Sequence, residues 1–204
     1  MIAIIDYGVG NLFSLKSSFA HIGEEAVVTS DRKVLSEASG IILPGVGAFA
    51  DAISKLNDSG MGEALKDELR KGKPAMGICL GMQLLFDESL EYGRYEGLKL
   101  IPGTVRSIND VTDGSLKIPH MGWNALHIVK EDCPVLKYTK EGDHVYFVHS
   151  YFADDCAPYV TSTAEYGVSI TASVQKDNLF GCQFHPEKSG EVGLKILKAF
   201  CELG

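Results

Sequence analysis

A sharp bend lies between a short apolar run and a helical pattern in residues 73–86. The run from Ala75 to Ile78 ends at Cys79, which has a glycine two residues before it and another two residues after it. Downstream apolar residues recur at the i, i+3, i+4 spacing of a helix, at Met82, Leu85 and Phe86. A residue held in a strained bend crowds its i−2 and i+2 neighbours, and glycines relieve that crowding. The stretch therefore predicts strand, tight turn and helix, as in α/β folds.

The same bend suits a nucleophile at Cys79. Gly77-Ile78-Cys79-Leu80-Gly81 is the thiol counterpart of the Gly-x-Ser-x-Gly elbow, which holds its nucleophile above a sheet. At a helix N-terminus, the unpaired amides and the positive end of the helix dipole favour thiolate over thiol. The alternative is an inert core cysteine, because free cysteines are often buried. The paired glycines favour the nucleophile.

A base and a group to orient it stand near the other end of the chain, in Phe184-His185-Pro186-Glu187. In an extended segment residues i and i+2 project to the same side, so His185 and Glu187 can face one site. Cys79, His185 and Glu187 would then form a nucleophile, base and orienter. The alternative is a surface histidine followed by a glutamate that opens a helix.

These motifs resemble those of the class I (triad) glutamine amidotransferases. The resemblance rests on the elbow from Gly77 to Phe86 and on Phe184-His185-Pro186-Glu187-Lys188-Ser189-Gly190. Four further segments are similar to the glutaminase subunits of imidazole glycerol phosphate synthases: Tyr7–Asn11, Leu43–Phe49, Ile118–Asn124 and Phe147–Tyr151. The similarity extends from Asp6 to Gly190, nearly the whole chain.

Strands alternate with helices in the first half of the chain. Strands are expected at 2–6, 26–29, 40–43 and into Cys79, and helices at 11–22, 32–38, 48–56 and 61–71. This predicts an open, mostly parallel α/β sheet covered by helices on both faces. The second half predicts antiparallel additions to the same sheet, including 143–151 and 168–175, and a closing helix at 191–201. We expect one domain over residues 1–204.

Pro44-Gly45-Val46-Gly47 follows an expected strand, so its amides would emerge where open α/β sheets place their sites. We expect an oxyanion hole made by the amide of Leu80 and that of Val46 or Gly47. The glycines that flank Val46 would let its peptide rotate at low energetic cost. We expect this rotation to activate the site when the partner has bound its own ligand. Gly8-Val9-Gly10 lacks the third glycine of a dinucleotide-binding loop and is better explained as a turn.

The family resemblance implies roles for further residues. Substrate binding is implied for Gln83, Glu91, Ser150 and Tyr151, although Glu91 is alternatively a solvated loop carboxylate. Contact with a partner subunit is implied for Val9, Asn11, Pro119, Met121, Trp123, Tyr146 and Lys188. Without the resemblance, Trp123 would be read as a core residue.

The resemblance also implies an activity. Glutamine would be hydrolysed to glutamate and ammonia through a thioester on Cys79, and the ammonia would pass to a cyclase subunit in histidine biosynthesis, with no metal or organic cofactor. Three alternatives stay open. They are the glutaminase subunit of an anthranilate or pyridoxal phosphate synthase, a catalytically idle regulatory module, and a hydrolase of γ-glutamyl peptides.

Composition excludes some classes of function. A net charge of −8 argues against a nucleic-acid partner, which requires a basic face. The start Met1-Ile2-Ala3-Ile4-Ile5-Asp6 suits a buried strand better than a signal peptide, and no apolar run has the length of a membrane span. The five cysteines include no Cys-x-x-Cys pair, which suggests a reducing cytoplasm and no zinc site.

Overall fold

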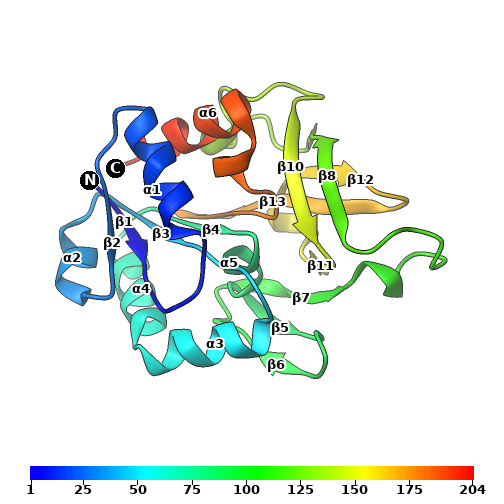
Figure 1. Ribbon diagram of the computed structural model, residues 1–204, viewed down its shortest axis with the longest axis horizontal. Helices are drawn as coiled ribbons and strands as arrows, with labels where there is room; N and C mark the ends of the chain where they lie inside the picture. Colours follow the sequence, from blue (N-terminus) through cyan, green and yellow to red (C-terminus); the bar gives the residue numbers. More distant parts are fainter.

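An eight-stranded sheet runs through the molecule in the computed structural model, which describes residues 1–204 (Figure 1). Its strand order is β2-β1-β3-β4-β14-β13-β12-β9. Four of its seven strand pairs are parallel: β1 with β2, β1 with β3, β3 with β4, and β4 with β14. The strands are β1 (Ile2–Ile5), β2 (Ala26–Thr29), β3 (Gly40–Leu43), β4 (Ala75–Ile78), β9 (His127–Ile128), β12 (Val160–Glu165), β13 (Ser169–Lys176) and β14 (Leu179–Cys182).

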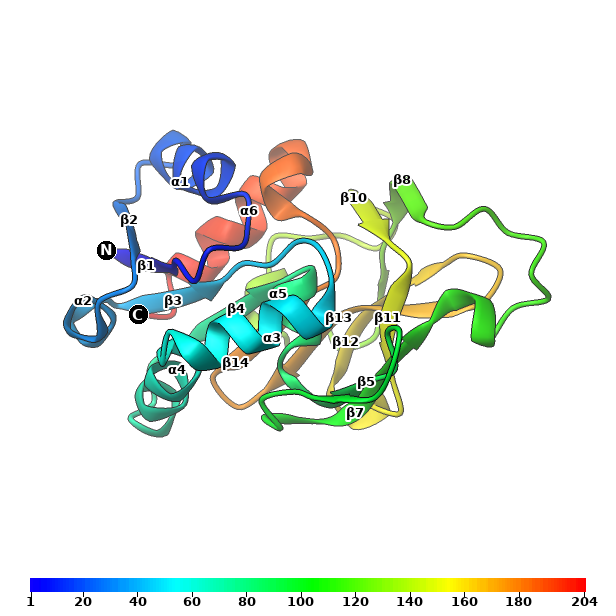
Figure 2. The same ribbon diagram turned by 60° about the horizontal axis from the view of Figure 1, so that its bottom comes forward.

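Helices cover both faces of the parallel half, as the sequence predicts (Figures 1 and 2). One face carries α1 (Leu12–His21) and α6 (Gly190–Cys201), and the other carries α2 (Arg32–Glu37), α3 (Phe49–Asp58) and α4 (Met61–Arg70). Each face has its own buried cluster, of 28 and 23 residues. β1, β3 and β4 are buried at every position, which explains why they read as continuous apolar runs. No helix has the length and apolar character needed to cross a bilayer.

The second half of the chain departs from the expected single sheet. β12, β13 and β9 do extend the main sheet antiparallel to their neighbours. Two smaller sheets are separate: β10 (His144–His149) pairs with β8 (His120–Ala125), and the other has the order β11-β7-β5-β6. The strands of that sheet are β5 (Phe86–Ser89), β6 (Tyr95–Glu96), β7 (Ile101–Ser107) and β11 (Tyr151–Asp154). The run expected at 143–151 is therefore divided between two sheets at Ser150.

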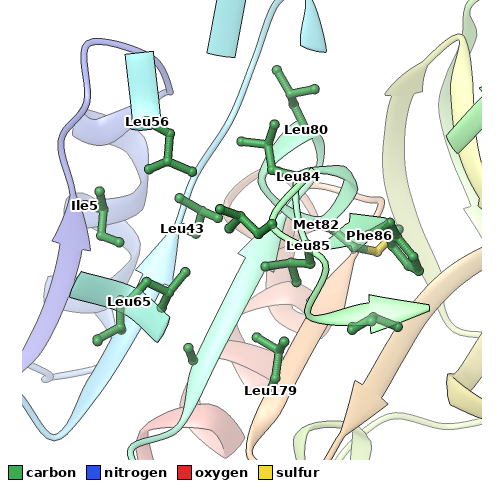
Figure 3. Close-up of a cluster of buried hydrophobic side chains, with 14 of the residues drawn as sticks. Ile5, Leu43, Leu56, Leu65, Leu80, Met82, Leu84, Leu85, Phe86 and Leu179 are labelled. Atoms are coloured by element: carbon green, nitrogen blue, oxygen red, sulfur yellow. The ribbon is translucent and has the colours of Figure 1, made fainter. Parts of the chain in front are cut away.

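The helix expected after the bend is shorter than its apolar spacing predicts. α5 covers only Leu80–Gln83, and Phe86 already begins β5. The carbonyl of Leu85 accepts from the amides of Leu100 and Ile101, which draws the backbone out of the helix. The apolar spacing instead serves packing, and Figure 3 shows the side chains that fill the cluster beside β4: Leu43, Leu80, Met82, Leu84, Leu85 and Leu179.

Candidate active site

Cys79 occupies the bend between β4 and α5 in a strained conformation, with φ 55° and ψ −114°. Such a conformation is uncommon for a residue with a side chain. Both flanking glycines are needed for close approach. A Cβ on Gly81 would lie 1.9 Å from the Leu43 carbonyl oxygen, and one on Gly77 would lie 2.6 Å from the Gly81 oxygen. The bend is therefore a tight elbow packed on the end of β3.

His185 comes to the elbow because β14 pairs with β4. The Cys79 amide donates to the Cys182 carbonyl at 2.8 Å, which places the segment after β14 beside the bend. His185 Nδ1 lies 2.8 Å from Glu187 Oε1, and these side chains are 3% and 1% exposed. The expected extended backbone is wrong for residues 186–188, which form a 3-10 turn. The turn still directs the carboxylate back to the ring.

Opposing effects set the charge of the imidazole. Burial disfavours a charged ring, but hydrogen bonds and charge interactions with Cys79 and Glu187 outweigh it and raise the pKa of His185 to about 9. The second carboxylate oxygen, Glu187 Oε2, is buried without a hydrogen-bond partner. The arrangement therefore favours an imidazolium held between a sulfur and a carboxylate.

One cavity of about 310 Å³ opens over the elbow. This volume lies in the range of roughly 300–1,000 Å³ typical of small-molecule sites. Its lining includes nine of the residues expected at the site: Val46, Gly47, Cys79, Leu80, Gln83, Glu91, Ser150, Tyr151 and His185. Glu187 does not line the cavity and stands behind His185. Ser150 and Tyr151 reach it because the chain changes sheets at this point.

The loop after β3 presents free amides to this cavity. Val46 is 42% exposed, and Gly47 has φ +92°. Neither amide donates to a protein acceptor. The loop lies against the elbow, since a Cβ on Gly45 would lie 2.5 Å from the Gly81 nitrogen. On its other side the Tyr7 hydroxyl donates to the Pro44 carbonyl at 2.7 Å.

Glu91 is not the solvated carboxylate that the sequence allowed as an alternative. It is buried, Oε2 accepts from the Phe49 amide at 2.6 Å, and burial raises the pKa of its carboxyl. Gln83 is also buried, and its Nε2 donates to the carbonyl of Tyr151 at 2.9 Å. Both residues line the cavity.

Several residues of the site had no role predicted from the sequence. Val148 and His149 line the cavity, and both belong to the Phe147–Tyr151 segment, which carried the family signal without a role for either residue. Gln183 is fully buried, and its Nε2 lies 3.7 Å from Cys79 Sγ. Its position two residues before His185 was the available signal. Pro119 and Lys188, expected at a partner contact, also reach the cavity.

The other residues expected at a partner contact gather beside the cavity. Met121 and Trp123 on β8 are 64% and 57% exposed, so a core role for Trp123 is wrong. Trp123 pairs in register with Tyr146, with ring centroids 6.2 Å apart, and Lys188 Nζ lies 5.9 Å from the Tyr146 ring centroid. We call these four residues the β8 face. Val9 and Asn11 are half-buried in the loop after β1.

Comparisons with known proteins agree with this geometry. The family model "Glutamine amidotransferase class-I" matches residues 3–202. The chain is 53% identical to the "Imidazole glycerol phosphate synthase subunit HisH" of Caldanaerobacter subterraneus subsp. tengcongensis, over 100% of this chain and 98% of that protein. It is 50% identical to the protein of the same name from Geobacter sulfurreducens, over 99% and 98% of the two chains.

Solved structures share the fold at low sequence identity. A glutamine amidotransferase crystal structure superposes with a TM-score of 0.76 at 16% identity, over 100% of this chain and 98% of that one. The structure of PurLQS from Thermotoga maritima gives a TM-score of 0.74 at 19% identity, over 98% of this chain and 97% of that one. With a family model that matches nearly the whole chain, this protein belongs to the class-I glutamine amidotransferases.

Proposed function

We propose that this chain is the glutaminase subunit of an imidazole glycerol phosphate synthase and supplies ammonia to a cyclase subunit in histidine biosynthesis. The observation that carries the proposal is the arrangement of Cys79, His185 and Glu187 at one cavity, with the carboxylate behind the imidazole. The names of relatives that are about half identical over the full length support the biosynthetic assignment. They favour it over anthranilate and pyridoxal phosphate synthases.

The first chemical step forms a thioester. Cys79 Sγ attacks the side-chain amide carbon of glutamine, and the carbonyl oxygen becomes an oxyanion. The amide of Leu80 and that of Val46 or Gly47 donate to it. When the tetrahedral intermediate collapses, the C–N bond breaks and His185 gives its proton to the departing nitrogen, which leaves as ammonia. A γ-glutamyl thioester on Cys79 remains.

The second step returns the enzyme to its starting state. The now neutral His185 takes a proton from water, and the hydroxide attacks the thioester carbon. The C–S bond breaks, which releases glutamate and restores the thiolate beside an imidazolium. Glu187 holds the ring by its Nδ1 throughout, so that Nε2 faces the reacting atoms. No metal or organic cofactor enters either step.

The β8 face supports a protein partner. Aromatic and methionine side chains are enriched in interfaces. Here Met121 and Trp123 are exposed, and the half-buried Tyr146 lies beside Lys188, which also lines the cavity. A cyclase bound over Met121, Trp123, Tyr146 and Lys188 would cover the mouth of the glutaminase site. Ammonia would then leave toward the partner and not into water. The loop with Val9 and Asn11 would extend the contact.

Replacement of Cys79 by alanine tests the assignment. In a complex of this chain with the cyclase, Cys79→Ala should abolish glutamine-dependent synthesis and leave synthesis from added ammonium intact. Cys201→Ala, which changes a cysteine on α6, is the matched control and should retain both. Loss of both activities in the Cys79→Ala complex, or of neither, would contradict the proposal. Glutaminase activity on γ-glutamyl peptides without a partner would favour the hydrolase alternative.

The loop at Val46 supports a switch that responds to the partner. Its amides are free of protein acceptors, and Gly45 and Gly47 let the peptide between them rotate at low cost. Loss of one oxyanion donor lowers acyl-transfer rates by about 10²- to 10³-fold, so one rotated peptide could control the rate. Glutaminase rates should therefore rise when the cyclase and its ligand are added. A rate indifferent to both would rule the switch out.

A further inference from the structure

Two buried histidines outside the triad contact each other between the β8 face and the cavity. His120 on β8 is 3% exposed, and His149 on β10 is 6% exposed. His120 Nδ1 lies 3.0 Å from His149 Nε2. The His120 ring is stacked between Phe147 and Tyr166, with centroid distances of 4.8 and 4.1 Å. Both rings are thus fixed in place by packing and by each other.

The hydrogen bonds of this pair have one consistent direction. A carbonyl can only accept, so His149 Nδ1 donates to the Tyr151 oxygen at 2.9 Å, and its Nε2 accepts from His120 Nδ1. His120 Nε2 then accepts from Asn124 Nδ2 at 3.2 Å. The Asn124 amide is oriented independently, since Nδ2 also donates to the Glu165 carbonyl and Oδ1 accepts from the Ala125 amide.

Both rings are neutral in this arrangement, and every ring nitrogen has a partner. Burial lowers the pKa of His120 to about 4, and burial lowers that of His149 to about 3 with a further contribution from its histidine neighbours. Neither ring is therefore suited to transfer a proton in glutamine hydrolysis near neutral pH. Their contribution is instead to hold neighbouring groups in position through hydrogen bonds.

The far end of the chain of bonds is the substrate site. The Tyr151 carbonyl that accepts from His149 also accepts from Gln83 Nε2 at 2.9 Å. Gln83 Nε2 donates in addition to Gln183 Oε1 at 2.9 Å, and Gln183 Nε2 lies 3.7 Å from Cys79 Sγ. Three side-chain amides, two imidazoles and the Tyr151 backbone carbonyl thus connect β8 to the nucleophile.

The other end of this chain of bonds, at Asn124 and His120, lies on β8, the strand that carries Met121 and Trp123 of the β8 face. Side chains alternate along β8, so that Met121 and Trp123 are exposed while His120 is buried and Asn124 half-buried. A displacement of β8 by a bound partner would therefore move His120 and Asn124 directly. We call the chain of hydrogen bonds from Asn124 through His120 and His149 to the Tyr151 carbonyl the relay. Because the relay has one hydrogen-bonding pattern, the displacement would reach the Tyr151 carbonyl through His149.

We propose that Asn124, His120 and His149 are positioning residues that fix the Tyr151 carbonyl and Gln83 for glutamine binding and that couple this binding to the seating of β8. The proposal rests on the glutaminase function proposed above. It assigns the three residues to substrate affinity and not to the chemical steps. Their loss should therefore raise the KM for glutamine and leave kcat nearly unchanged.

The test replaces one ring and then restores one of its hydrogen bonds. In the complex with the cyclase, His120→Phe keeps the stacking on Phe147 but leaves His149 Nε2 without a donor. We expect the KM for glutamine to rise about tenfold, which corresponds to roughly 1.4 kcal/mol. His120→Asn, whose amide can donate toward His149, should recover much of that loss. His144→Phe, at the exposed start of β10, is the matched control and should match wild type.

Two further readouts separate the possible failures. Ammonium-dependent synthesis and thermal unfolding show that each variant complex is folded and assembled. Suppose that the wild-type complex is active and the His120→Phe complex is folded. If this variant then keeps the wild-type KM for glutamine, or loses only kcat, the relay is overturned and the glutaminase function is not. Equal KM values for His120→Phe and His120→Asn would also overturn it. A wild-type complex that does not hydrolyse glutamine would overturn the glutaminase function, and the relay with it.

Discussion

Two buried histidines line the cavity and a third, His120, contacts one of them, and their surroundings shift their pKa values in opposite directions. His185 faces a carboxylate and a sulfur, and its pKa rises to about 9 in spite of burial. Burial lowers the pKa of His120 to about 4, and burial together with the neighbouring His120 and His185 lowers that of His149 to about 3. Near neutral pH, histidine is therefore a proton donor at position 185 and a neutral hydrogen-bonding ring at positions 120 and 149. Burial disfavours the charged form of all three rings, and only at His185 do Cys79 and Glu187 outweigh it.

The raised pKa of His185 predicts how activity depends on pH. The ring is protonated below about pH 9 and neutral above it. Departure of ammonia needs that proton, so glutaminase kcat/KM should fall as the pH rises through about 9. Glu187→Gln removes the carboxylate that helps to raise this pKa, so the fall should begin at lower pH. The rate itself should also drop, by roughly 10²- to 10⁴-fold.

A pH series of glutaminase assays on the complex checks this prediction. Glu131→Gln, at an exposed position between β9 and β10, is the matched control and should keep the wild-type profile. An alkaline fall at the same pH in Glu187→Gln and wild type would contradict the role given to the carboxylate.

The neutral histidine pair predicts a loss of stability in acid. In the unfolded chain each ring takes up a proton below its ordinary pKa of about 6.5, whereas the folded rings stay neutral to about pH 4 and about pH 3. The unfolded state thus binds more protons, and the free energy of unfolding falls as the pH falls from about 6.5. Urea unfolding should show a shallower acid loss in His120→Phe than in His144→Phe. Identical slopes would contradict the burial of a neutral ring.

At the scale of elements, the parallel half of the fold was predictable because its signals are local. Ala26–Thr29 and Gly40–Leu43 have the bounds that the sequence predicts, since each is a short apolar run between turn residues. The second half depends on which strands pair. The run at 143–151 has an uninterrupted β pattern, yet pairing with β8 and β7 divides it at Ser150. No local signal records that choice.

The residues of the site also divide into those with local sequence signals and those that depend on distant contacts. Cys79 and its glycines were predictable because the elbow is one continuous segment with a fixed spacing, although the atom that excludes a side chain at Gly81 is the Leu43 oxygen of β3. His149 and Gln183 could not be assigned a role from their own neighbours in sequence. Their roles depend on bonds to residues 29 and 100 positions away, His120 and Gln83. Such contacts become visible only when the sheets are assembled.

The close packing of the elbow predicts that a methyl group added at Gly81 lowers both stability and activity. Gly81→Ala would place Cβ 1.9 Å from the Leu43 carbonyl oxygen, so backbone must move. We expect destabilisation of about 1–3 kcal/mol, together with loss of most glutaminase activity, because Cys79 moves with the turn. Thermal unfolding and alkylation of Cys79 by an electrophilic glutamine analogue measure the two effects.

Gly62→Ala on α4 is the matched control for this change. Its Cβ would meet the end of the flexible Leu98 side chain at 3.2 Å, and alanine favours helix. It should therefore unfold near the wild-type temperature and react normally at Cys79. Equal behaviour of the two variants would show that the elbow tolerates a side chain and would remove the mechanical reason for its glycines.

At the scale of the molecule, the cavity lies where three sheets meet. The elbow and His185 come from the main sheet, Tyr146 and His149 come from the β8–β10 pair, and Tyr151 begins a strand of the third sheet. A partner seated on the β8 face would contact the middle one of these three units. In the proposed function, subunit contact and substrate binding therefore share the small β8–β10 sheet, whose Val145 and Phe147 also pack into a core cluster of the parallel half.

This arrangement predicts that docking depends on Trp123 more than on other exposed aromatic residues. Trp123→Ala should weaken binding of the cyclase by about tenfold or more, because an exposed tryptophan packed against Tyr146 has the properties of an interface anchor. Tyr138→Ala, at an exposed ring beside the C-terminal end of α6, is the control. Titration calorimetry of each variant with the cyclase gives the affinities. If both variants bind the cyclase equally well, the partner binds elsewhere on the molecule. Partner binding could then not be coupled to glutamine binding through β8.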